Sequence, residues 1–209
     1  MRTLYITFLI ACLTPAHHLF GQEPGGTPSV PTDGAGFTSA LFDTAALKAI
    51  LSDAGTVGIR FYNVLVPPDN RVGSAMAVGI RTDGSEVNKG KAYRIGLGFI
   101  EGMLITMDLT TKEAKNACAA MQASGHPSYS ASFTRTELET LMELSGCQAV
   151  QVTPDVTATR ETTMRLTAMK VVDDKAVPLG SGPQYERVCG FPCPSVCGAA
   201  KNYVYQAPR

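Results

Sequence analysis

Three cysteines stand four residues apart near the end of the chain, in the stretch VCGFPCPSVCG at positions 188–198. Closely spaced thiols bind metals, exchange disulfides or cross-link a chain. A structural zinc site needs four ligands, usually two close pairs separated by a longer loop, and this spacing does not match that pattern. Glycine and proline between the cysteines disfavour a helix that would align the three thiols. We therefore assign no metal ligands and no cofactor, and keep a small metal-binding protein as a second alternative.

A tail stapled by disulfide bonds fits these residues better. Exported proteins meet oxidising surroundings, where cysteines in loop-rich segments usually pair, and each bridge that closes a long loop stabilises the fold by about 2–4 kcal/mol. Cys147, just past a predicted helix, is the favoured internal partner for one tail cysteine, although two tail cysteines can also bridge locally. Cys118 is interpreted as a small buried hydrophobe. The disulfide candidates are Cys147, Cys189, Cys193 and Cys197.

Hydrolytic chemistry has few residues to use. His126 is the only histidine outside the N-terminal segment, so a Ser-His-Asp or Cys-His arrangement must include it. Asp173 and Asp174 are adjacent in a predicted turn, where carboxylates are usually solvated. We assign no catalytic residue and lean away from an enzyme. An exported enzyme that uses carboxylates or a free cysteine is the first alternative.

One strand carries a candidate binding face. In GIRFYN, residues 58–63, strict alternation places Ile59 and Phe61 on the inner side of a predicted strand. Arg60 and Tyr62 would then share an outer face, with Asn63 and Arg81 close by, that can hold a partner or an anionic group. A solvated sheet face is the simpler interpretation, because the outer positions of antiparallel sheets are polar in any case. The candidate face consists of Arg60, Tyr62, Asn63 and Arg81.

The overall composition is typical of a globular protein and carries no net charge. Of 209 residues 44% are hydrophobic, and 18 basic residues balance 18 acidic ones. Without a basic surplus, binding to nucleic acid or to an anionic membrane surface is not expected. The expected partner is another protein or a cell-surface component.

The N-terminus predicts export. Arg2 precedes an apolar run at residues 4–13, which is typical of a signal peptide and too short to span a membrane. Cleavage after Gly21 would leave Gln22 first. A lipoprotein signal is the competing interpretation, with Cys12 as the lipidated residue and a lipid anchor in place of a transmembrane segment. The predicted location is periplasmic, outer-membrane-associated or secreted.

The whole chain divides into six parts, and the pattern of helices and strands in them predicts an α+β fold. Two helix–β-hairpin units repeat at an offset of 91 positions, with a hairpin and a helix between them. The helix starts carry capping boxes at Thr110–Glu113 and Thr134–Glu137. We expect mostly antiparallel sheet packed on one layer of helices. The predicted parts are a signal peptide (1–21), a flexible linker (22–36), the first unit (37–91), the connecting hairpin and helix (92–132), the second unit (133–180) and a Cys/Pro-rich tail (181–209).

A resemblance accompanies these patterns. The set Phe-x4-Leu-x2-Ile-Leu from Phe42, then GIRFY at 58–62 and PCPSVC at 192–197, resembles an uncharacterised family of small, often exported bacterial proteins. The second unit departs from it, with AVQVT where the first has GIRFY. The resemblance implies no known activity and no catalytic residues. We therefore expect an exported, non-enzymatic binding or assembly module at the cell surface or in the periplasm.

Overall fold

The computed structural model describes residues 38–87, 89–126, 129–158 and 160–189. The predicted signal peptide and linker, Cys12, Cys193 and Cys197 lie outside these residues. The described chain forms three helices and ten strands in an α+β fold, as predicted. In chain order these are β1 (Ala40–Asp43), α1 (Thr44–Leu51), β2 (Gly58–Leu65), β3 (Gly73–Ile80), β4 (Tyr93–Ile100), β5 (Met103–Leu109), α2 (Thr111–Ala123), β6 (Ser130–Thr134), α3 (Arg135–Met142), β7 (Ala149–Val156), β8 (Thr162–Val172), β9 (Lys175–Pro178) and β10 (Glu186–Val188).

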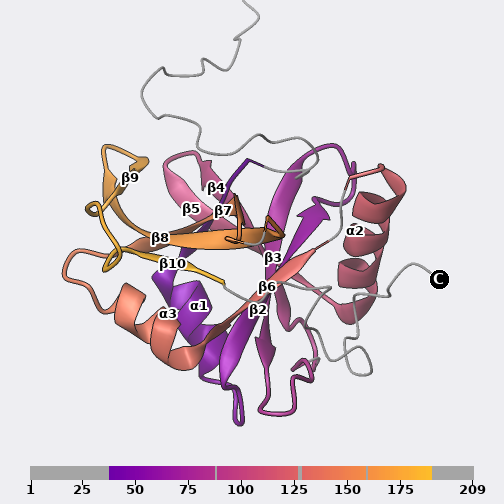
Figure 1. The fold of residues 1–209 in the computed structure, drawn as a ribbon. Helices are drawn as coiled ribbons and strands as arrows, with labels where there is room; N and C mark the ends of the chain where they lie inside the picture. The colour runs from indigo at the N-terminus through magenta and orange to yellow at the C-terminus, as the bar shows by residue number, and fades with distance from the viewer. Residues whose placement is uncertain (1–37, 88, 127–128, 159, 190–209) are drawn as a thin grey trace, which may run out of the picture.

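The strands form two antiparallel sheets. Sheet A has the order β1-β7-β8-β10, with β9 also paired to β8, and sheet B has the order β5-β4-β3-β2-β6. In Figure 1 the long strand β8 of sheet A runs across β2 and β3 of sheet B. Two short strands, β9 and β10, border β8, and β10 lies within the predicted Cys/Pro-rich tail.

Helix starts follow their predicted caps. Thr110 and Glu113 form a capping box at α2, and Thr134 and Glu137 form another at α3, both as predicted. Asp43 caps α1 by accepting a hydrogen bond from the Ala45 backbone N–H at 2.6 Å. Each cap satisfies N–H groups that have no partner inside the helix, so these three starts are fixed locally.

Each helix–hairpin unit receives a strand from the other unit. β1, which leads into α1, pairs with β7, and β6, which leads into α3, pairs with β2. The registers correspond, because Asp43 lies opposite Ala149, the first residue of β7, and Thr134 lies opposite Gly58, the first residue of β2. The sequence did not predict β1 or β6 as strands.

The same correspondence appears in the element bounds. α3 begins 91 residues after α1, at 135 against 44, and β7 begins 91 residues after β2, at 149 against 58. Thr44 N–H donates to the Gln148 carbonyl at 3.2 Å, and Arg135 N–H donates to the Val57 carbonyl at 2.7 Å. The first residue of each helix is thus tied to the residue that precedes the other unit's hairpin.

The helices lie on two sides of sheet B, so the predicted single layer of helices is wrong. α1 and α3 contribute to a first core that lies between the sheets and includes Phe42, Phe61 and Phe133. α2 covers the opposite face of sheet B and forms a second core with residues such as Tyr62 and Tyr93. Figure 1 shows α2 on its own side, apart from α1 and α3. The predicted connecting helix is therefore a covering element for the sheet.

Candidate functional site

The predicted outer face on β2 lies inside the protein. The alternation itself is correct, because Ile59 and Phe61 join the first core while Tyr62 joins the second. However, Arg60, Tyr62 and Asn63 are at most 5% exposed. Arg60 and Tyr62 lie on the face that α2 covers with small residues such as Ala117, whereas Asn63 alternates to the other face. Of the four predicted residues, these three are therefore buried, and Arg81 is half-exposed.

Glu86 organises a buried polar cluster on this face. Its side chain is 0% exposed and accepts hydrogen bonds from the hydroxyl groups of Tyr62 and, at 3.1 Å, Tyr93. Arg60 Nη1 lies 3.4 Å from Glu86 Oε1 and forms an ion pair with it. Arg60 also donates to Ser132 Oγ at 3.1 Å. The sequence did not single out Glu86, since an isolated acid in a predicted loop has no periodic signal.

The other two predicted residues hold neighbouring segments in place. Arg81 Nη1 donates to the backbone carbonyl of Glu86 at 3.4 Å. Asn63 Oδ1 accepts from the Tyr129 backbone N–H at 2.8 Å, which ties β2 to the start of β6. The predicted set thus comes together around β2, where it anchors the β3–β4 connection and β6.

Burial and the Glu86 carboxylate keep the hydroxyl and thiol groups of this region neutral. Burial, followed by the nearby Glu86 carboxylate, raises the pKa of Tyr62 and the pKa of Tyr93 well above the usual tyrosine range. Burial and Glu86 also raise the pKa of the Cys118 thiol. The tyrosines are therefore hydrogen-bond donors at neutral pH, and Cys118 lacks the thiolate character of a reactive cysteine.

The described cysteines are free and far apart. Cys118, Cys147 and Cys189 form no disulfide with one another. Gln148, next to Cys147, donates to the Met169 carbonyl, whereas Cys189 N–H donates to the Met164 carbonyl. Met164 and Met169 are five residues apart on β8, which corresponds to about 16 Å along the strand. Cys147 and Cys189 lie near these two positions and are therefore too far apart for a disulfide bond. A disulfide in this fold must therefore include a cysteine outside the described residues.

Metal and membrane features are absent from the described part of the chain. No group of three His, Cys, Asp or Glu side chains there is arranged to hold a metal ion. No described helix is long and apolar enough to cross a membrane. His126 is exposed after the end of α2.

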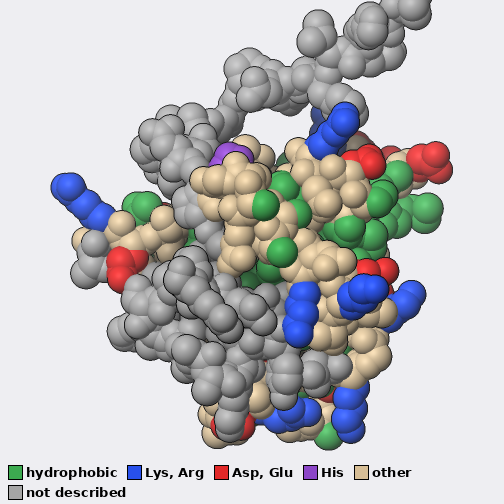
Figure 2. Space-filling model, turned by 90° about the vertical axis from the view of Figure 1, so that its right-hand side faces the viewer, with side chains coloured by type: hydrophobic (Ala, Val, Ile, Leu, Met, Phe, Trp, Pro, Cys, Tyr) green, Lys and Arg blue, Asp and Glu red, His purple; other side chains and the backbone are tan. Residues whose placement is uncertain are grey.

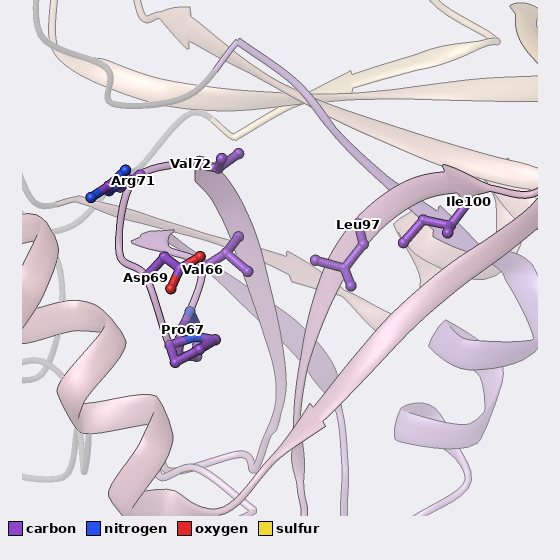
Figure 3. Close-up of a pocket in the computed structure, with 8 residues that line it drawn as sticks. Val66, Pro67, Asp69, Arg71, Val72, Leu97 and Ile100 are labelled. Atoms are coloured by element: carbon purple, nitrogen blue, oxygen red, sulfur yellow. The ribbon is translucent and has the colours of Figure 1, made fainter.

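An apolar pocket of about 370 Å³ opens at the end of the second core (Figure 3). The connection between β2 and β3 forms one wall, and β4 contributes Leu97 and Ile100. Val66 and Leu97 also pack against the second core, so the second core reaches solvent at this pocket. Its lining residues are Val66, Pro67, Pro68, Asp69, Arg71, Val72, Leu97 and Ile100.

The apolar surface continues beyond the pocket. Val72 is 65% exposed and Ile100 is 48% exposed, and Met103, the cross-strand neighbour of Ile100, is 61% exposed. Figure 2 shows the side of the molecule on which α2 lies, where hydrophobic side chains gather at the upper right beside acidic and basic ones. Exposed apolar groups around a concave site are typical of binding surfaces. The sequence missed this site because its walls come from segments that pair only in the folded sheet.

No family model, no curated protein and no solved structure matches this chain.

Proposed function

We propose that this chain is an exported, non-enzymatic binding or assembly module that works at the cell surface or in the periplasm and binds its partner through the apolar pocket. The pocket carries this proposal. Its volume of about 370 Å³ falls in the range of roughly 300–1,000 Å³ that is usual for ligand sites. The buried cluster around Glu86 contributes no residue to its lining, so the polar side chains and the pocket do not form one site.

A binding titration tests the proposal. The full mature chain, labelled with ¹⁵N, is titrated with the uncharged peptide acetyl-Phe-Gln-amide, whose phenylalanine ring is the apolar group. We expect amide shifts in the lining residues of the pocket. Ile100→Glu should abolish them, because it places a charge in the apolar wall. Val156→Glu is the matched control, since Val156 is also 48% exposed but lies on β7, outside the lining. Equal shifts in both variants would exclude the pocket as the binding site.

We also propose that the two helix–hairpin units arose by internal duplication. The shared offset of 91 residues in α1/α3 and β2/β7 supports it, and so does the corresponding register of the exchanged strands. If the first strand of a unit pairs with the other unit, duplication of the unit produces this pairing twice. It thus accounts for β1 and β6, each of which pairs with a strand of the other unit.

One mass measurement tests what we propose for the two ends of the chain. We propose export with cleavage before Gln22. In the tail, we propose a disulfide bond between Cys193 and Cys197, or between one of them and Cys147 or Cys189. The exported protein is alkylated under native conditions with and without reduction, and its intact mass is compared. Mass differences from reduced cysteines and a Gln22 start would support both proposals. A lipid on Cys12 would replace the cleavage proposal, and alkylation of every tail cysteine without reduction would exclude the staple.

A further inference from the structure

We infer that the partner segment in the apolar pocket is an extended peptide in which a large apolar residue is followed by a lysine or arginine. This inference rests on the proposed function of the pocket. It concerns the chemistry of the ligand, for which the pocket supplies two separate observations: a carboxylate beside the apolar lining residues, and an exposed apolar surface that continues beyond the cavity.

Charge at the pocket favours a cation. Asp69 and Arg71 are the charged residues of the lining. Figure 3 shows the Asp69 carboxylate beside Val66, whereas the Arg71 side chain extends away from Leu97 and Ile100. Within the described chain Asp69 has no hydrogen bond and no ion pair. An unpaired carboxylate at the mouth of an apolar cavity attracts a positive charge attached to an apolar group.

A second acid follows the opposite wall in sequence, outside the lining. Glu101 directly follows Ile100 and is exposed in the turn between β4 and β5. It has no ion pair with a described residue. Glu101 is outside the lining, so Asp69 is the carboxylate on which the inference rests, and Arg71 extends away from Leu97 and Ile100.

The extent of the apolar surface favours a chain segment over a small amine. Ile100 and Met103 are cross-strand neighbours on β4 and β5, and both are exposed beside the cavity. Val72 extends the same surface on the other wall. A small amine would fill the cavity and leave these side chains in water, whereas an extended peptide can cover them with its neighbouring residues.

A charge series tests the inference. The ¹⁵N-labelled full chain is titrated at low salt with acetyl-Phe-Lys-amide, acetyl-Phe-Gln-amide and acetyl-Phe-Glu-amide. We expect the lysine peptide to bind roughly two- to five-fold tighter than the glutamine peptide, the effect of one exposed ion pair, and the glutamate peptide to bind weakest. Asp69→Asn should remove most of the preference. Asp53→Asn, an exposed acid after α1, is the matched control and should keep it.

The outcomes separate this inference from the proposed function. Equal binding of the three peptides would overturn the inference while the pocket remains a binding site. An unchanged preference in Asp69→Asn would also overturn it. Tighter binding of phenethylammonium than of the lysine peptide would identify a small amine as the occupant and exclude the peptide. If none of the peptides shifts the lining residues, the proposed function fails as well.

Discussion

Glu86 is the residue on which the buried polar side chains converge. Its carboxylate is fully buried and holds two tyrosine hydroxyl groups and one guanidinium group. Burial of a charge is tolerated only when partners replace the lost hydration. These contacts join β2, β4 and the β3–β4 connection, so the cluster stabilises the wall of the second core from which the pocket opens.

Removing one hydroxyl group from this cluster should destabilise the protein. Tyr62→Phe deletes a donor to Glu86, and we expect a loss of about 1.5–3 kcal/mol in the free energy of unfolding, measured with urea. Tyr129→Phe is the matched control, because the buried Tyr129 hydroxyl has no hydrogen-bond partner among the described residues. We expect that variant to be neutral or more stable. Equal losses of stability in the two variants would show that the hydrogen bond from Tyr62 to Glu86 does not stabilise the fold.

High pH should weaken the fold through the same tyrosines. Burial raises the pKa of Tyr62, Tyr93 and Tyr129 in the folded state. The unfolded chain releases these protons near pH 10, whereas the folded chain retains them. Stability is therefore complete below about pH 10 and falls as the pH rises above that value.

Urea titrations at several pH values between 8 and 11.5 measure this effect. Tyr129→Phe should reduce the slope of stability against pH by about 1.4 kcal/mol per pH unit above pH 10, without a matching loss at pH 7. An unchanged slope in this variant would contradict the burial of a neutral hydroxyl at Tyr129.

At the scale of elements, β1 depends on a glycine in β4. A Cβ atom at Gly96 would lie 2.6 Å from the Leu41 carbonyl oxygen, which is backbone and cannot move aside easily. Gly96→Ala should destabilise the protein by about 1–3 kcal/mol and speed hydrogen exchange of the β1 amides. Gly98→Ala is the control on the same strand, because nothing lies within 4 Å of its Cβ position. That variant keeps only the backbone cost of φ +82°. Protected β1 amides in Gly96→Ala would contradict the packing of β1 on β4.

Some elements could be predicted from sequence and others could not. The helices at Thr111–Ala123 and Arg135–Met142 carry capping boxes and apolar periodicity, which are local signals. β1 and β6 have four and five residues, too few for alternation to stand out, and each runs directly into a helix cap. The pairing of β1 depends on residues about 110 positions away, and that of β6 on residues about 70 positions away, which no local pattern contains.

The candidate site shows the same limit. Alternation along β2 correctly separated Ile59 and Phe61 from Arg60 and Tyr62. It did not indicate that α2 covers the face with Arg60 and Tyr62. A polar face is predicted to be solvent-exposed unless a covering helix is known. The pocket was not predicted at all, since its two walls are separated in sequence and meet only through the pairing of β3 with β4.

At the scale of the whole molecule, the exchanged strands should hold the two halves together without a covalent link. A protease site placed between Ser124 and His126 allows the folded chain to be cut after α2. We expect the fragments to elute together and to unfold in one transition, because β1 and β6 each pair across the cut and the first core includes both halves. Fragments that separate into two folded species would contradict the exchange and the duplication built on it.

The location of a bound apolar group tests the central proposal most directly. Intermolecular nuclear Overhauser effects are measured between the phenylalanine ring of acetyl-Phe-Lys-amide and the methyl groups of the full chain. We predict contacts to Val66, Val72, Leu97 and Ile100, which line the pocket. Contacts to exposed methyl groups elsewhere, such as those of Val57 or Val156, or a lack of contacts at saturating peptide, would contradict a binding module that works through this pocket.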